Sequence, residues 1–146
     1  QGEHMSNSIM NLVPYLSFRG DCEEALNFYA RIFGGNVTVR ERYNNPAMNV
    51  PKKFPDKVLH ASLEFGGVTI LASDIIPKNP GESATGSGDA ALSLDVSSSE
   101  DGKKIFDQLA QGGKVNVPFE KQFWGAWHGN LRDKYGIRWM VNCDKP

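Results

Sequence analysis

The sequence has little cysteine. Only Cys22 and Cys143 occur among its 146 residues, and they stand far apart in the chain. Disulfide frameworks and zinc sites need more thiols at closer spacings, so neither is predicted. We therefore expect both thiols to be reduced and to take no part in the chemistry.

The chain also lacks an excess of charge and any long apolar run. Its 16 basic residues nearly balance 17 acidic ones, so no basic surface for nucleic acid is predicted. A membrane-spanning helix needs about 20 apolar residues, and no run approaches that length. Residues 1–4, ahead of Met5, are interpreted as an expression scar, which excludes His4 from the site. Because no secretory signal is visible, a cytoplasmic location is expected.

The clearest pattern present is a strand followed by a helix. In Val13–Phe18 apolar and polar residues alternate, which predicts a strand with one buried face. Asp21 and Glu24 form a capping-box pattern at the start of a helix. The helix has one apolar stripe and ends at Gly34, where glycine accepts a left-handed conformation. The stripe consists of Ala25, Phe28, Tyr29 and Ile32.

A fainter copy of this pattern occupies the second half of the chain. After strands at Val37–Tyr43, Val58–Phe65 and Val68–Ser73, the strand-helix motif restarts near Leu94 with a helix at Glu100–Gln111, capped from Ser97–Ser99. Three more strands follow, at Val115–Phe119, Phe123–Leu131 and Ile137–Asn142. The sequence therefore predicts an α+β fold of two βαβββ modules, residues 9–76 and 90–146 of a single domain at 5–146. Together they form a curved mixed sheet, with helices on the convex face and a concave trough.

Two connections stand out by length and composition. Ile76–Asp89 is rich in glycine, serine and proline and is interpreted as the linker between the modules. Asn44–Lys57 is a long loop, and long loops inside compact domains often cover a site. The alternative, a loose excursion or an arm that reaches a second subunit, stays open.

Several motifs together resemble a known family. They are PYLSF (Pro14–Phe18), EEALNFY (Glu23–Tyr29), FGG (Phe33–Gly35), FPDKVLHA (Phe54–Ala61), FWG (Phe123–Gly125) and DKYGIRWMVN (Asp133–Asn142). The chain is identified on these motifs as a member of the PhnB-like branch of the vicinal-oxygen-chelate (glyoxalase and bleomycin-resistance) superfamily. The resemblance implies that fold and a homodimer. It does not fix a reaction, because the superfamily includes isomerases, thiol transferases, dioxygenases and drug-sequestering proteins. Proteins of this branch also carry a methyltransferase label, but this sequence contains no glycine-rich nucleotide-binding turn that would support it.

The resemblance also implies four positions for a divalent metal, two on the first strands and two on the last strands of the modules. They fall on Val13, Ala91, Leu71 and Met140. None of these side chains offers an oxygen or imidazole ligand, so we expect no metal and no cofactor.

Strand alternation supplies candidates for the trough. His60, Ser62 and Glu64 share one face of the third strand, opposite the apolar residues Leu59, Ala61, Leu63 and Phe65. His60 and Glu64 lie roughly 13 Å apart along a strand, so they could flank a ligand as acid and base but not bond each other. Alternatively, both are solvated polar residues.

A second group comprises Trp124, Trp127 and His128, which suit a flat or amphipathic ligand. Core packing or a dimer contact is the alternative, above all for Trp124. By strand alternation, Tyr15 is also predicted to face the trough. In contrast, Trp139 is predicted in the core and Asp133 as the cap of a turn.

These candidates lead to three functional hypotheses. The first is a homodimer that binds a small organic molecule in the trough without the usual metal. The second is a lyase- or isomerase-type enzyme that uses a non-standard metal site or the pair His60 and Glu64. The third is an interaction module whose trough is filled by the partner subunit.

Overall fold

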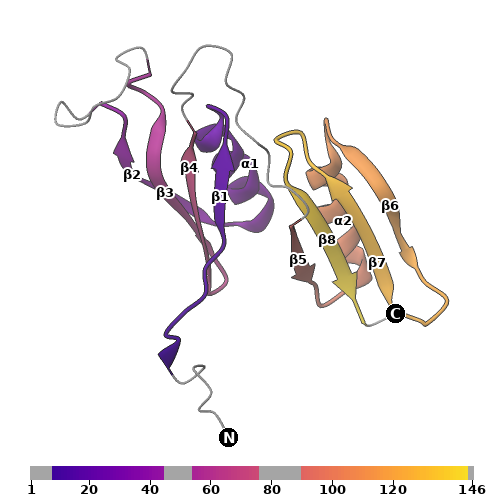
Figure 1. Ribbon diagram of the computed structural model, residues 1–146. Helices are drawn as coiled ribbons and strands as arrows, with labels where there is room; N and C mark the ends of the chain where they lie inside the picture. Colours follow the sequence, from indigo (N-terminus) through magenta and orange to yellow (C-terminus); the bar gives the residue numbers. More distant parts are fainter. Residues whose placement is uncertain (1–7, 45–53, 76–89, 145–146) are drawn as a thin grey trace, which may run out of the picture.

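The computed structural model describes residues 8–44, 54–75 and 90–144. Each half of the chain contains one strand, one helix and then three strands (Figure 1). The first consists of β1 (Tyr15–Phe18), α1 (Cys22–Phe33), β2 (Asn36–Arg42), β3 (Val58–Phe65) and β4 (Val68–Asp74). The second consists of β5 (Ala91–Asp95), α2 (Ser99–Ala110), β6 (Lys114–Lys121), β7 (Trp127–Arg132) and β8 (Arg138–Cys143). The predicted scar, the whole Ile76–Asp89 linker and most of the Asn44–Lys57 loop lie outside the described residues.

The strands form two four-stranded mixed sheets with the same topology. Their orders are β1-β4-β3-β2 and β5-β8-β7-β6. Strand β1 is parallel to β4, and β5 is parallel to β8. All other neighbouring strands are antiparallel. The predicted α+β class and the two βαβββ modules are therefore confirmed.

Helix α1 is amphipathic as predicted, but its start is capped by a different residue. Gly34 ends it in the left-handed conformation, with φ of 77°. Asp21 makes no side-chain capping bond, so that prediction is wrong. Asp74, from the end of β4, accepts hydrogen bonds from the backbone N–H groups of Gly20 and Cys22 instead, both at 2.9 Å. In α2 the predicted serine cap is confirmed, because Ser98 accepts from the N–H of Asp101 at 3.1 Å.

The two modules meet where α1 packs against the turn between β7 and β8. The hydroxyl of Tyr29 donates to Asp133 at 2.6 Å, and its ring lies 5.3 Å from that of Trp139. Tyr135 at the tip of the turn donates its hydroxyl to Glu24 at 2.8 Å. Trp139 is buried, as predicted. Residues of both modules thus contribute to the same apolar cluster.

Alternation along β3 separates its two faces. Ala61 and Leu63 are fully buried on the side that α1 covers. His60 and Ser62 therefore belong to the opposite side, which we call the uncovered face of the sheet. In the second sheet, Leu131 and Trp139 point into the core. The side of that sheet opposite to them is its uncovered face. Within the described parts of the chain, no helix is long and apolar enough to cross a membrane.

Candidate functional site

Three of the predicted site residues form a cluster on the uncovered face of the first sheet. The rings of Tyr15 and His60 are stacked, with centroids 6.2 Å apart and an angle of 18° between planes. Tyr15 lies on β1 beside Leu71 of β4, and Leu71 pairs in turn with Ser62 of β3. The register therefore brings Tyr15, His60 and Ser62 to adjacent rows of the sheet. We call these three residues the first half-site.

The first half-site is incompletely hydrogen-bonded. Ser62 is only 1% exposed, yet its hydroxyl has no hydrogen-bond partner among the residues that the structure describes. A buried polar atom without a partner costs about 1–3 kcal/mol, and such atoms in native proteins usually meet water or a ligand. In contrast, Tyr15 is 52% exposed and presents much of its ring to solvent. The cluster thus combines an accessible aromatic surface with an unused polar group.

The uncovered face of the second sheet carries a chain of hydrogen bonds across β5, β8 and β7. Asn142 donates its amide to Ser93 Oγ at 2.9 Å, while its Oδ1 lies 2.7 Å from His128 Nδ1. The other ring nitrogen, Nε2, lies 3.3 Å from the amide nitrogen of Asn130. We call Ser93, Asn142, His128 and Asn130 the polar ladder. The sequence analysis identified only His128 of these four residues. Strand alternation could have found two more, because Asn130 is on the same side of β7 as His128, and Asn142 is on the same side of β8 as Met140.

Trp127 is not on the same face as His128. It packs against Phe119 with ring centroids 5.5 Å apart, and Phe119 stacks on Phe106 of α2 at 5.9 Å. Trp127 therefore lies on the helix-covered side, because successive residues of a strand point to opposite faces. The structure does not bring Trp127 and His128 together on one surface.

The remaining predicted residues lie apart from both clusters. Glu64 is exposed near the end of β3, opposite Asn36 and Thr69, whereas His60 lies opposite Glu41. Trp124 is 59% exposed in the turn between β6 and β7, where it makes an edge-on contact with Phe123 at 4.9 Å.

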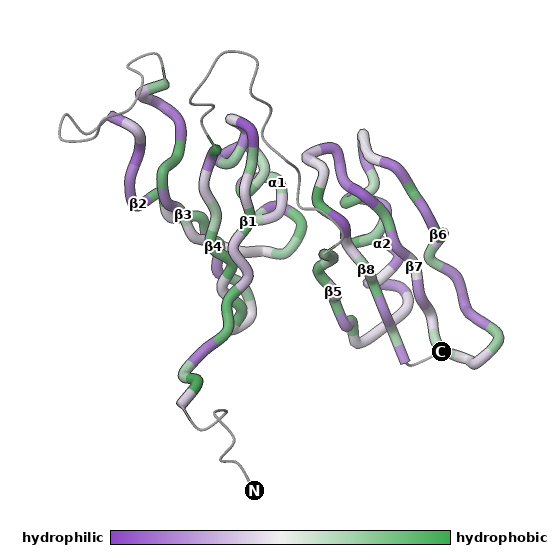
Figure 2. The backbone as a smooth tube through the Cα atoms, viewed as in Figure 1, coloured by the Kyte–Doolittle hydropathy of each residue, from purple (hydrophilic) through white to green (hydrophobic). Residues whose placement is uncertain are grey.

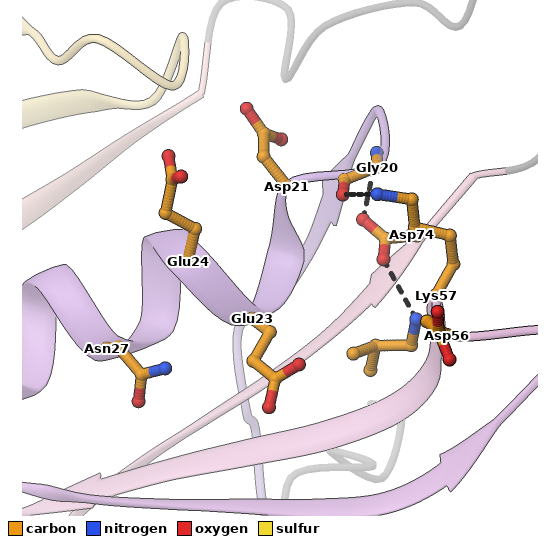
Figure 3. A pocket seen from close by; sticks show the side chains of 9 residues that line it. Gly20, Asp21, Glu23, Glu24, Asn27, Asp56, Lys57 and Asp74 are labelled. Atoms are coloured by element: carbon orange, nitrogen blue, oxygen red, sulfur yellow. Dashed lines mark hydrogen bonds between the residues drawn. The ribbon is translucent and has the colours of Figure 1, made fainter.

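A pocket of about 630 Å³ opens beside the start of α1, and none of the predicted site residues lines it (Figure 3). Several of its charges already have partners. Glu23 is paired with Arg42 at 2.9 Å, and this hydrogen bond lowers the pKa of Glu23. Lys57 donates to the carbonyl of Gly20 at 2.8 Å. Burial raises the pKa of Asp21. The residues that line it are Gly20, Asp21, Glu23, Glu24, Asn27, Asp56, Lys57, Val58 and Asp74.

The superfamily's metal positions do not fit a divalent ion in this chain. Leu71 lies between Tyr15 and Ser62, and Met140 lies between Ser93 and Asn130, so neutral hydroxyl and amide side chains flank the aliphatic and thioether groups there. Hard and borderline divalent ions prefer carboxylate or imidazole ligands. Among the described residues, no group of three or more His, Cys, Asp or Glu is arranged to hold a metal.

The fold is shared with solved structures that have little sequence similarity. A glyoxalase/bleomycin resistance protein/dioxygenase family enzyme from Burkholderia phytofirmans PsJN is 16% identical, with a TM-score of 0.59 over 88% of this chain and 94% of its own. This likeness shows the glyoxalase and bleomycin-resistance fold.

Two further proteins are more similar. Protein YjdN of Escherichia coli is 35% identical, with 93% of this chain and 97% of that protein covered. A structure described as a putative 3-demethylubiquinone-9 3-methyltransferase, PhnB protein, from Bacillus cereus is 27% identical. Its TM-score is 0.76, over 92% of this chain and 99% of that one. The model of the family described as 3-demethylubiquinone-9 3-methyltransferase matches residues 10–142. The chain therefore belongs to this PhnB-like family.

Proposed function

We propose that this protein binds a small, planar organic molecule at the first half-site, without a metal ion, in the cytoplasm. The observation that carries this function is the buried hydroxyl of Ser62, which has no partner among the described residues and lies in the same row of the sheet as the exposed Tyr15. Ligand sites in proteins typically combine apolar surface with a few polar groups that fix orientation. The three residues of the first half-site supply both.

Each residue has a separate role in this proposal. The exposed Tyr15 ring is available for stacking with the ligand, and the stacked His60 ring holds the Tyr15 ring in position. Ser62 gives or accepts the hydrogen bond that its buried hydroxyl does not make within the described part of the chain. A ring with a hydroxyl, carbonyl or carboxyl group satisfies these requirements. The family description names a ubiquinone precursor, and a quinone is such a ring.

The first prediction separates binding from stability at Ser62. Ser62→Ala removes a buried hydroxyl that has no partner, so the free energy of unfolding should stay equal or rise by about 1 kcal/mol. Binding should weaken by about 1 kcal/mol, roughly five-fold in Kd, because the ligand loses its hydrogen bond. A thermal-shift screen of quinones, aromatic acids and aromatic antibiotics identifies the ligand. Calorimetry then measures its Kd for the unaltered protein and for Ser62→Ala.

Tyr15→Leu and Ser17→Ala complete this experiment. Tyr15→Leu should weaken binding by about 0.5–1.5 kcal/mol through lost ring stacking. Ser17 is exposed on the same strand and lies outside the half-site, so Ser17→Ala should bind like the unaltered protein. A ligand whose affinity ignores Ser62→Ala and Tyr15→Leu binds elsewhere and refutes the proposal.

A second candidate function is acid–base chemistry of the lyase or isomerase type. The imidazole of His128, oriented through both ring nitrogens, favours it more than the predicted pair of His60 and Glu64, for which no such oriented hydrogen bonds are seen among the described residues. This enzyme would lose its turnover in His128→Gln and keep it in Glu64→Gln.

The second prediction concerns metal content. Protein without the first four residues should contain far less than one equivalent of nickel, zinc, manganese or iron by elemental analysis. The reason is the aliphatic and thioether chemistry at the superfamily's metal positions. Stoichiometric metal that survives removal of His4 would contradict a metal-free site.

The third prediction is a homodimer. The segment before β1 extends away from both sheets and carries exposed apolar residues, among them Met10 at 98% exposure (Figures 1 and 2). Ile9 and Leu12 are exposed in the same segment. Exposed apolar groups and unpaired sheet edges favour association with a second copy. Light scattering at micromolar concentration should give twice the chain mass of 16.1 kDa. A particle of the single-chain mass would be inconsistent with this expectation.

A further inference from the structure

His60 and His128 occupy equivalent positions in the two modules. In the first sheet Leu16 pairs with Ala72, which pairs with Ala61. In the second, Leu94 pairs with Val141, which pairs with Gly129. Because Leu16 and Leu94 are equivalent in the repeat, Ala61 corresponds to Gly129. The residue before each is then a histidine. The same argument relates Ser62 to Asn130 and Tyr15 to Ser93.

The equivalent positions differ in how their polar groups are used. The first half-site leaves Ser62 unpartnered and holds the His60 ring by stacking. At the equivalent positions of the second module, the polar ladder holds His128 through both ring nitrogens. The second module thus fixes the orientation of its imidazole, whereas the first leaves its imidazole available.

The polar ladder also determines which nitrogen of His128 carries the proton. The Asn142 amide nitrogen is used by Ser93, so its oxygen faces His128. An amide oxygen only accepts hydrogen bonds, and therefore Nδ1 of the neutral ring must be the donor. Nε2 is then unprotonated and accepts from the Asn130 amide.

We propose that Nε2 of His128 is a second ligand-binding point, which accepts a hydrogen bond from the hydroxyl group of a phenol-type ligand. This inference rests on the proposed binding of a planar molecule and adds the class of its polar substituent. The bond from Asn130 is long, at 3.3 Å, whereas direct O–H donors approach acceptors to about 2.7–2.8 Å. A phenolic hydroxyl therefore displaces Asn130 from Nε2, while Asn142 keeps the ring in place. An ether, which has no hydrogen to donate, cannot do so.

The first experiment needs no ligand. Long-range ¹H–¹⁵N spectra of ¹⁵N-labelled protein distinguish protonated from unprotonated ring nitrogens, and the chain has only three histidines to assign. At a pH where the ring is neutral, His128 should show a protonated Nδ1 and a bare Nε2. His60 should show mainly protonated Nε2, as a free imidazole does. Asn142→Leu should return His128 to that ordinary equilibrium, and Asn130→Ala should leave its tautomer unchanged. Protonated Nε2 in the unaltered protein overturns the proposal, as does an unchanged tautomer in Asn142→Leu.

The second experiment uses phenol and its methyl ether, anisole, as probes. Phenol should shift the Nε2 resonance of His128 in a saturable way, and anisole at equal concentration should not. In Asn130→Ala, where Nε2 is free, phenol should bind several-fold more tightly. An equal response to both probes, or no response to phenol, overturns the proposal. The two proposals fail separately, because the His128 resonances report on the polar ladder and Ser62→Ala reports on the first half-site.

Discussion

Replacing Asp133 with alanine should lower the free energy of unfolding by about 3–5 kcal/mol, the usual cost of breaking a buried charged network. Asp133 is only 4% exposed and accepts four hydrogen bonds. Two come from the side chains of Tyr29 and Trp139, at 2.6 and 2.9 Å. The other two come from the backbone N–H groups of Tyr135 and Ile137, at 2.9 and 3.0 Å. Removal of the carboxylate takes the acceptor from all four donors, three of which are in buried hydrogen bonds.

Denaturant unfolding measures this effect, and two variants test its origin. Tyr29→Phe removes one of the four donors together with the need to satisfy it, so it should cost only about 1–2 kcal/mol. Glu24→Gln alters the exposed contact of the same turn with Tyr135 and should change stability by less than about 1 kcal/mol. If Asp133→Ala cost no more than Glu24→Gln, the carboxylate would not join the two modules.

The sequence predicted only part of the role of Asp133. The pattern Asp133 to Gly136 indicates a turn, and the structure shows both the cap and a positive φ of 88° at Gly136. The second carboxylate oxygen, however, bonds Tyr29 in α1, more than one hundred residues away. Periodicity placed Tyr29 correctly on the buried stripe of its helix. It could not reveal a hydrogen bond to another module, since such contacts depend on how the modules pack.

The site shows the same division between local and tertiary information. Alternation in β3 correctly separated His60 and Ser62 from Ala61 and Leu63, because the predicted bounds of that strand equal the observed ones. The predicted strand Phe123–Leu131 begins too early, and the actual β7 starts at Trp127. Trp124 therefore lies in a turn. Strict alternation within β7 would also have put Trp127 and His128 on opposite faces.

The equivalence of the two histidines was hidden for a different reason. The first module contains the long Asn44–Lys57 connection, so a constant offset between the halves aligns the first strands but not the third. Only the pairing of β3 with β4 and of β7 with β8 aligns them. Strand register is a tertiary property, which explains why the sequence offered His60 and His128 as separate candidates.

The second large effect is expected at Asp74, where alanine should lower the free energy of unfolding by about 3 kcal/mol. Asp74 is 2% exposed, and its two oxygens accept from three backbone N–H groups. Gly20 and Cys22 donate to Oδ1 and Val58 donates to Oδ2, each at 2.9 Å. Figure 3 shows Asp74 next to Gly20. The side chain therefore joins the end of β4 to the starts of α1 and β3, and its removal leaves three donors unsatisfied.

Asp21 provides the matched control for this prediction. It stands at the helix start that the sequence assigned to it, yet it makes no capping bond. Burial and the neighbouring charges of Asp74 and Glu24 raise its pKa, so its own carboxylate is not stabilised there. Asp21→Ala should therefore change stability by less than about 0.5 kcal/mol, far below the roughly 1 kcal/mol that a working cap contributes. Urea unfolding of the two variants decides between them. A loss at Asp21 equal to that at Asp74 would mean that the local cap, and not the carboxylate from β4, holds the start of α1.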